Sequence, residues 1–115
     1  MQTFDVGQLG VDQGETVLFS DFEDGGDMWT GEGPRQARLP VAFSEAFSAI
    51  PIVSVSITMF DASSGSNIRF DIQAEGVTPQ GFDVVFRTWG DSKVARVRAK
   101  WQAIGTISTE EVWDI

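Results

Sequence analysis

Apolar and polar residues alternate in three consecutive runs within residues 67–105, and short turns join these runs. The runs cover residues 69–76, 81–89 and 95–103. A period of two residues is the signal of a half-buried strand. The pattern therefore predicts a three-stranded antiparallel meander, with Trp101 on the inward, buried face of its third strand.

Parity determines the register of these hairpins, because a shift of one residue would turn every side chain to the wrong face. In the first hairpin, which closes at residues 78–80, this register places Arg69 beside Trp89. The same register pairs Asp71 with Arg87 and Glu75 with Asp83. In the second hairpin, the predicted neighbours are Asp83 with Lys100 and Arg87 with Arg96.

Three further strands are predicted before the meander, at residues 16–20, 35–43 and 52–59. Pro40 lies in the middle of one of them, and since proline cannot donate to the ladder, that strand is expected at a sheet edge. The loop that follows brings in Phe47 as an apolar plug. No stretch shows helical periodicity. Six short strands with turn-rich connections predict an all-β fold, a six-stranded antiparallel β-sandwich.

Composition narrows the possible functions. A chain of 115 residues is long enough to form one domain whose hydrophobic core is stable without disulfide bonds. It has no cysteine and no histidine, so thiolate and imidazole chemistry are excluded. The net charge of −9 argues against nucleic acid and membrane insertion. The beginning of the chain has no signal-peptide pattern, so we expect cytoplasmic synthesis, with action outside the cell or on a virion.

The chain is predicted to divide into three parts. Residues 1–14 are a lead-in or partner-binding arm, residues 15–107 the sandwich, and residues 108–115 a tail. Residues 1–34 contain eight acidic side chains and no basic one. Two interpretations remain: a solvated acidic head, or a head that folds against the basic strand face of its own chain or of a neighbour.

Catalysis is not expected. The sequence contains none of the common nucleotide, hydrolase or metal motifs, and its strand carboxylates lie beside arginines, which favours an ordinary salt-bridge ladder. The pair Arg69 and Trp89 is more informative. From the residues alone, an outward indole beside an arginine indicates either a protein interface or a ligand-binding site.

Several segments carry a family resemblance. They are residues 41–44, 51–61 and 77–82, together with Asn67-Ile68-Arg69, Thr88-Trp89, Lys93-Val94 and Trp101. These segments resemble the H-type lectin domain family, which is represented by snail agglutinins and the C-terminal part of discoidins and has many bacterial members. The resemblance covers about residues 29–105 and points to a bacterial or phage-associated member.

The resemblance implies a non-enzymatic, six-stranded lectin that forms a homotrimer or a dimer of trimers. It also implies binding of galactose or N-acetylgalactosamine glycans at subunit interfaces, without metal or cofactor. The family's ligand-holding arginine falls on Arg69, its tryptophan on Trp89 and its acidic residue on Glu32. Gly90 stands where the snail protein has a histidine, and Ala95 where it has a tyrosine. Gly90 would contribute backbone and space to the site.

Two functions follow from the sequence. The first is a carbohydrate-binding module with a role in cell adhesion. The alternative is a non-catalytic trimeric structural or attachment module, such as a phage tail or adhesin tip, that has lost sugar binding. For assembly, we predict that the outward face of the meander lies near the threefold axis. That face would carry Arg87, Arg96, Arg98 and Lys100 among acidic residues, with Val85 as an apolar island.

Overall fold

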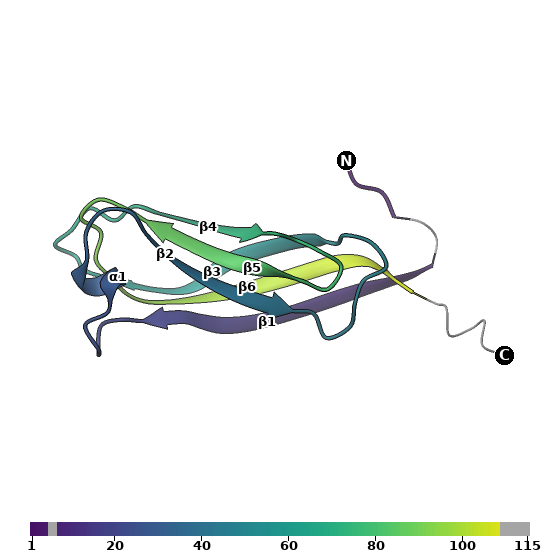
Figure 1. Ribbon diagram of the computed structural model, residues 1–115, viewed down its shortest axis with the longest axis horizontal. Helices are drawn as coiled ribbons and strands as arrows, with labels where there is room; N and C mark the ends of the chain where they lie inside the picture. Colours follow the sequence, from purple (N-terminus) through teal and green to yellow (C-terminus); the bar gives the residue numbers. More distant parts are fainter. Residues whose placement is uncertain (5–6, 109–115) are drawn as a thin grey trace.

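The computed structural model of the protein describes residues 1–4 and 7–108. Within them the chain forms six β-strands and one short helix (Figure 1). In chain order these are β1 (Gln8–Ser20), α1 (Asp27–Thr30), β2 (Arg35–Ala42), β3 (Ile52–Ala62), β4 (Phe70–Glu75), β5 (Gly81–Thr88) and β6 (Val94–Ile107). No helix in this part of the chain has the length and apolar character needed to cross a membrane.

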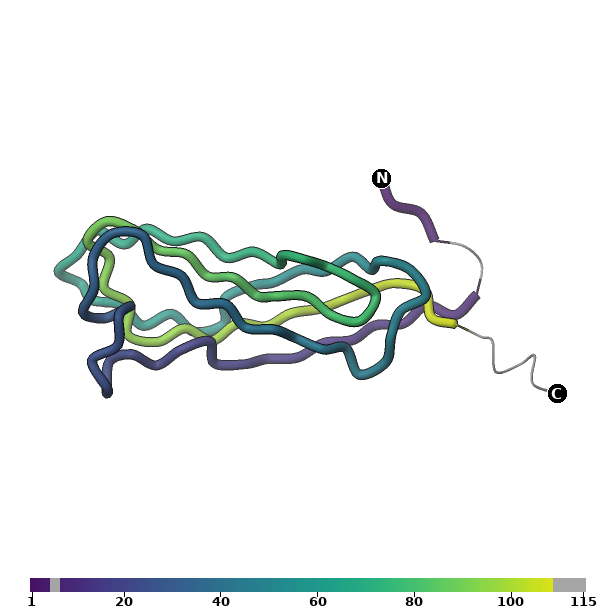
Figure 2. The backbone as a smooth tube through the Cα atoms, viewed as in Figure 1, coloured from purple at the N-terminus to yellow at the C-terminus, as the bar shows by residue number. Residues whose placement is uncertain are grey.

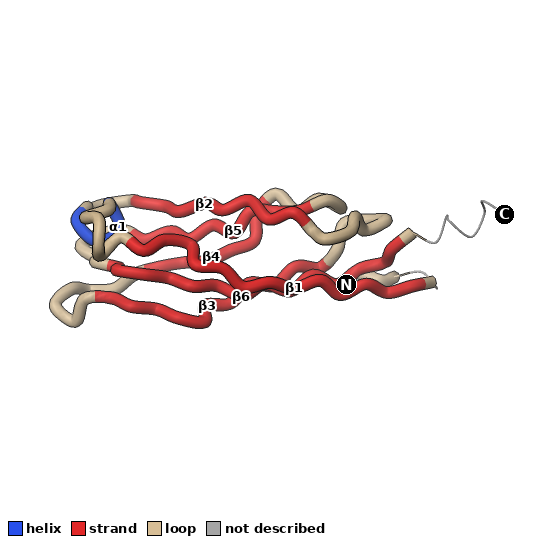
Figure 3. Tube along the Cα trace, turned by 90° about the horizontal axis from the view of Figure 1, so that it is seen from below, coloured by secondary structure: helices blue, strands red, loops and turns tan. Residues whose placement is uncertain are grey.

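The strands form two antiparallel sheets of three strands each, ordered β1-β6-β3 and β2-β5-β4. Figure 3 shows the sheets as two stacked layers. The predicted six-stranded antiparallel sandwich is therefore confirmed. Strand β2 lies at an edge of its sheet, which confirms the position expected from Pro40.

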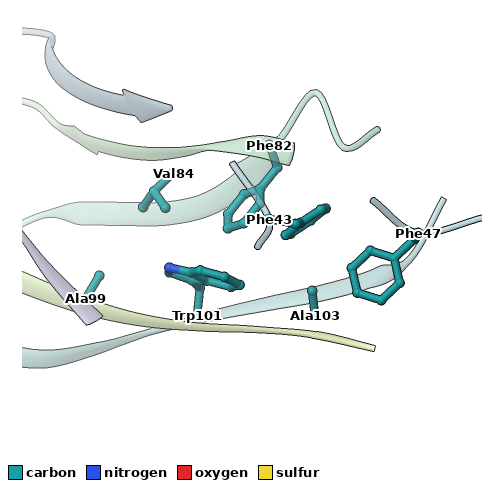
Figure 4. Close-up of a cluster of buried hydrophobic side chains, with 7 residues drawn as sticks. All are labelled: Phe43, Phe47, Phe82, Val84, Ala99, Trp101 and Ala103. Atoms are coloured by element: carbon teal, nitrogen blue, oxygen red, sulfur yellow. The ribbon is translucent and has the colours of Figure 1, made fainter. Parts of the chain in front are cut away.

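The core between the layers contains the aromatic residues that alternation placed inward. Trp101 is only 8% exposed, and its ring centroid lies 5.5 Å from that of Phe82 and 5.9 Å from that of Phe43. Figure 4 shows Phe82 and Val84 pointing from one sheet toward Trp101 on the other. Phe47 is buried at the end of this cluster, as the predicted plug. A second cluster, of Met28, Phe86, Val94 and Val97, lies nearer α1.

The predicted meander is correct for its first hairpin and wrong for its second. Strands β4 and β5 pair in the expected register, with Asp71 opposite Arg87 and Glu75 opposite Asp83. Strand β6, however, lies in the other sheet, between β1 and β3. Both edges of β5 are occupied by β2 and β4, so the chain crosses between layers after β5. The pairs Asp83 with Lys100 and Arg87 with Arg96 therefore do not form.

This crossover also divides the charged face that was predicted to assemble around a threefold axis. Arg96 and Lys100 lie on the outer side of β1-β6-β3, whereas Arg87 lies on the outer side of β2-β5-β4. Val85 is 0% exposed within its own chain and is no apolar island. Arg38 lies opposite Val85 on β2, and its Nη2 is 3.1 Å from Oε1 of Glu75 on β4. The Arg38 side chain therefore extends across β5 and covers Val85.

The proposed boundary between a lead-in at 1–14 and the sandwich is wrong, because β1 begins at Gln8. Strand β1 contains two glycines, Gly10 and Gly14. In the structure they let core side chains approach the backbone: a Cβ atom at Gly14 would lie 2.7 Å from Nε1 of Trp101. Strand β6 ends at Ile107, and residues 109–115, most of the predicted tail, lie outside the described residues.

Each of the two interpretations of the acidic residues 1–34 holds for a part of this segment: β1 packs against a basic strand, and the loop after β1 is exposed to solvent. Strand β1 pairs along its length with β6, and the Glu15 carboxylate lies 3.6 Å from Nε of Arg98. Asp12 accepts hydrogen bonds from the backbone and hydroxyl of Ser44. In the following loop, by contrast, Glu23 and Asp24 are exposed.

Candidate functional site

Three loops meet at one end of the sandwich, the end that carries α1 and lies opposite the end where β1 begins and β6 ends (Figure 2). They are residues 21–34, 63–69 and 89–93. The β4–β5 ladder ends with the pair Phe70 and Thr88, and Arg69 and Trp89 are the next residues along the two strands beyond this pair. Both side chains are exposed, Trp89 by 41%. The structure therefore brings together the two residues that the sequence singled out.

A buried serine fixes the backbone of both residues. Ser92 is 0% exposed, and its hydroxyl oxygen accepts a hydrogen bond from the Arg69 backbone N–H at 2.8 Å. The same oxygen lies 3.0 Å from the carbonyl oxygens of Trp89 and Asn67, to one of which it can donate its proton. Thr88, also buried, donates to the Arg69 carbonyl at 2.5 Å. The two exposed side chains thus project from a rigid base.

Sequence reasoning missed Ser92 and Thr88. Ser92 follows Gly90 and Asp91, and serine in such a sequence is a common turn residue. Thr88 ends a predicted strand, and threonine is a residue type that is common in strands. No local signal shows that the Ser92 hydroxyl joins its own turn to the loop at residues 63–69, because Asn67 and Arg69 are about 25 residues away in the sequence.

Gly90 lies directly beside the arginine. Its φ of +69° is in the left-handed region that glycine adopts without strain. A Cβ atom there would lie 3.6 Å from Nη1 of Arg69, so Gly90 leaves space next to the guanidinium. The Gly90 carbonyl accepts hydrogen bonds from the Gly33 N–H at 2.9 Å and from Nη2 of Arg35 at 3.2 Å. The loop before β2 is therefore held against this turn by its own chain.

Arg35 is a buried positioning residue that was expected only to begin a strand. Besides Gly90, its guanidinium donates to the carbonyls of Gly33, Asp27 and Met28. It thereby ties α1, the loop before β2 and the turn after β5 into one unit.

Two residues stand apart from this arrangement. Glu32 is exposed on the loop next to Gly33, and its carboxylate has no hydrogen bond or ion pair with any described residue. The structure therefore places Glu32 near the site without joining it to Arg69. Ala95, where the snail lectin has an aromatic residue, is buried on β6.

A cavity of about 480 Å³ opens beside Trp89, on the outer face of β2-β5-β4. It is lined by Pro34, Arg35, Gln36, Asp71, Arg87, Thr88 and Trp89. Arg87 makes hydrogen bonds to Glu75 from both terminal nitrogens. Arg87, and after it Arg38, keeps the pKa of the Glu75 carboxyl below its ordinary value, because these hydrogen bonds favour the charged form.

This end of the molecule exposes the indole of Trp89 and the guanidinium of Arg69 beside the glycine turn at Gly90. An indole offers an apolar stacking face, and a guanidinium offers several oriented donors. Among the described residues, no group of three or more carboxylates is arranged to hold a metal ion. Such a surface can hold a small ring that has one apolar face and several hydroxyl groups.

Comparisons with known proteins match this chain to a domain family and to several individual proteins. The model of the H-type lectin domain matches residues 38–104. A protein of Fuscovulum blasticum, named "ATP synthase subunits region ORF 7", is 55% identical over 93% of both chains. A discoidin-1 protein of Dictyostelium discoideum is 36% identical over 64% of this chain.

Solved structures show the same fold. Recombinant discoidin II of Dictyostelium discoideum superposes over 94% of this chain with a TM-score of 0.75 and 25% identity. A tailspike protein of a Pseudomonas phage covers 88% of this chain and 15% of its own, with a TM-score of 0.55 at 16% identity, a likeness of fold alone. The chain spans 30% of the discoidin-1 protein and 40% of the discoidin II chain. Because the family model matches more than half of the sequence, this chain belongs to the H-type lectin domain family.

Proposed function

We propose that this chain is a non-catalytic carbohydrate-binding module that recognises a terminal galactose or N-acetylgalactosamine residue through Arg69, Trp89, Gly90 and Glu32. The observation that carries the proposal is that Arg69 and Trp89 lie together at the end of the β4–β5 ladder. Both side chains are exposed, and the backbone beneath them is tied together by Ser92. Because the backbone of the site is already ordered, less conformational entropy is lost when a ligand binds.

Each residue has a separate role in this proposal. Trp89 stacks on the apolar C–H face of the sugar, and Arg69 donates to two neighbouring hydroxyl groups. Gly90 leaves room for the ring beside the guanidinium. Glu32, exposed on the adjoining loop, accepts hydrogen bonds from the sugar hydroxyls.

Calorimetry with N-acetylgalactosamine and galactose tests the site directly. Arg69→Ala is expected to weaken binding by about 1.5–3 kcal/mol, the range for hydrogen bonds to a charged group. Arg96→Ala is the matched control, because it also removes an exposed arginine. Arg96 forms an ion pair with Asp61 and lies outside the proposed site. A chelator is expected to leave affinity unchanged. Equal affinity of Arg69→Ala and Arg96→Ala for every sugar would refute this assignment.

We further propose that the chain forms a homotrimer, so that several weak sites act together. Support comes from the outer face of β1-β6-β3, where Val11, Ile104 and Ile52 lie opposite one another in a row. Val11 is 58% exposed and Ile52 46% exposed, which leaves apolar surface for another copy to cover.

Light scattering coupled to size exclusion tests this assembly. The wild-type chain is expected to elute with the mass of three copies at micromolar concentration. Val11→Asp is expected to shift it toward the monomer, while Gln73→Asp on the opposite sheet leaves it unchanged. A wild-type monomer, or a Val11→Asp variant that still forms the trimer, would contradict the proposed interface.

The alternative function is a trimeric attachment or structural module without sugar binding. Two observations favour it: Gly90 supplies no side chain to a ligand, and Glu32 makes no contact with Arg69. An intact trimer that binds no glycan on a broad array would establish this alternative over the lectin function.

A further inference from the structure

The cavity beside Trp89 is separate from the position proposed for the terminal sugar. Its floor is the row formed by Gln36, Arg87 and Asp71, which lie opposite one another on β2, β5 and β4. Pro34 and Trp89 line it at the end nearer the loops. Arg69 and Gly90 do not line it, so Trp89 borders both places.

Two polar side chains of this cavity have hydrogen-bonding atoms that are available to a ligand. Among the described residues, neither the Gln36 amide nor the Asp71 carboxylate has a hydrogen bond or ion pair. Asp71 lies opposite Arg87, but the terminal nitrogens of Arg87 are directed to Glu75, at 2.5 and 3.2 Å. Arg87 therefore attracts Asp71 only through space, and the Asp71 oxygens can accept hydrogen bonds from a ligand.

The chemistry of the cavity suits a second sugar ring. Its volume of about 480 Å³ lies within the usual range for small-molecule sites, about 300–1,000 Å³. Trp89 and Pro34 provide apolar surface, while Asp71 and Gln36 provide an acceptor and a group that both donates and accepts. A phosphate or sulfate group is disfavoured, because it would lie against the Asp71 carboxylate.

We propose that this cavity is a second sugar subsite, so that the ligand of this chain is a disaccharide or a longer glycan. The inference rests on the proposed function: the terminal sugar lies at Arg69, and the next residue passes over the edge of Trp89 into the cavity. There its hydroxyl groups donate to Asp71 and exchange hydrogen bonds with Gln36. The cavity then selects glycans by the residue that follows the terminal sugar and by its linkage.

The experiment compares one monosaccharide with a panel of disaccharides by calorimetry. The monosaccharide is methyl N-acetylgalactosaminide. The disaccharides carry N-acetylgalactosamine joined in turn to each ring hydroxyl of galactose. At least one disaccharide is expected to bind about tenfold more tightly than the methyl glycoside, which is the effect of about one hydrogen bond to a charged group.

Three variants make the test specific. Asp71→Ala and Gln36→Ala are expected to reduce the affinity for that disaccharide to the level of the methyl glycoside and to leave the methyl glycoside unaffected. Gln73→Ala is the matched control, because Gln73 lies two residues from Asp71 on the same face of β4 but outside the cavity. Far-ultraviolet circular dichroism verifies that each variant keeps the wild-type fold.

The outcomes separate this inference from the proposed function. If the methyl glycoside and every disaccharide bind equally, and Asp71→Ala changes neither, the subsite is refuted while the Arg69 site stands. If Asp71→Ala weakens both ligands by the same factor, Asp71 serves the terminal sugar and the separate subsite is again refuted. If no sugar binds, the proposed function fails and the subsite falls with it.

Discussion

The substitution Ser92→Ala tests whether a single buried hydroxyl holds the candidate site together. The Ser92 oxygen accepts the Arg69 N–H at 2.8 Å and donates to a nearby carbonyl, with those of Trp89 and Asn67 both at 3.0 Å. Alanine removes both interactions. Because Ser92 is fully buried, water cannot replace the hydroxyl without a local opening of the loops.

The magnitude follows from these two interactions. A buried N–H left without a partner costs about 1–3 kcal/mol, and the lost donated bond adds about 0.5–1.5 kcal/mol. We therefore expect Ser92→Ala to lower the free energy of unfolding by about 2–4 kcal/mol. For a slope of about 1–2 kcal/mol per molar urea, the midpoint falls by roughly 1–4 M.

Urea unfolding monitored by tryptophan fluorescence measures this difference. All variants are compared at one chain concentration, because unfolding of an oligomer depends on concentration. Ser54→Ala is the control, since Ser54 is exposed on β3 and makes no hydrogen bond within the described residues. If Ser92→Ala is too unstable to purify, Thr88→Val removes only the hydrogen bond to the Arg69 carbonyl and is expected to cost about 1–2 kcal/mol.

The reasoning is refuted if Ser92→Ala and Ser54→Ala unfold at the same urea concentration. A second readout concerns function. Under native conditions Ser92→Ala is expected to bind sugar more weakly than Ser54→Ala, because Arg69 and Trp89 lose their shared anchor. Equal sugar affinity for the two variants would show that the side chains keep their geometry without it.

Three further predictions concern the core, the turn and the pH dependence of stability. Trp101→Ala is expected to destabilise the fold by about 3–5 kcal/mol in urea unfolding, because it empties the centre of the aromatic cluster. Gly90→Ala is expected to cost about 1–2 kcal/mol at its positive φ, whereas Gly65→Ala, whose φ is not in that region, costs less. The pKa of Glu75 is lowered in the folded state by Arg87, so its contribution to stability is complete above about pH 4.5 and is lost as the pH falls through the lower folded pKa. Urea midpoints measured across this range are therefore expected to fall less for Glu75→Gln than for wild type.

The sequence by itself determined which side chains face the core and how the β4–β5 hairpin is aligned. Alternation is a local property of the chain, and a tight turn leaves one register in which both apolar faces point the same way. These two facts place Trp101 in the core and bring Arg69 and Trp89 to the same end of the hairpin. The principal pair of the candidate site was therefore predictable, although its supporting residues were not.

Only the tertiary structure decided which strands lie side by side. A strand with one apolar face has the same pattern whether the next strand lies beside it or opposite it across the core. The choice for β6 depends on β1, which pairs with it from Gln8 to Ser20 and is distant in sequence. The same holds for Ser92 and for the cavity at Gln36 and Asp71, because each is formed by segments that meet only after the two sheets have stacked.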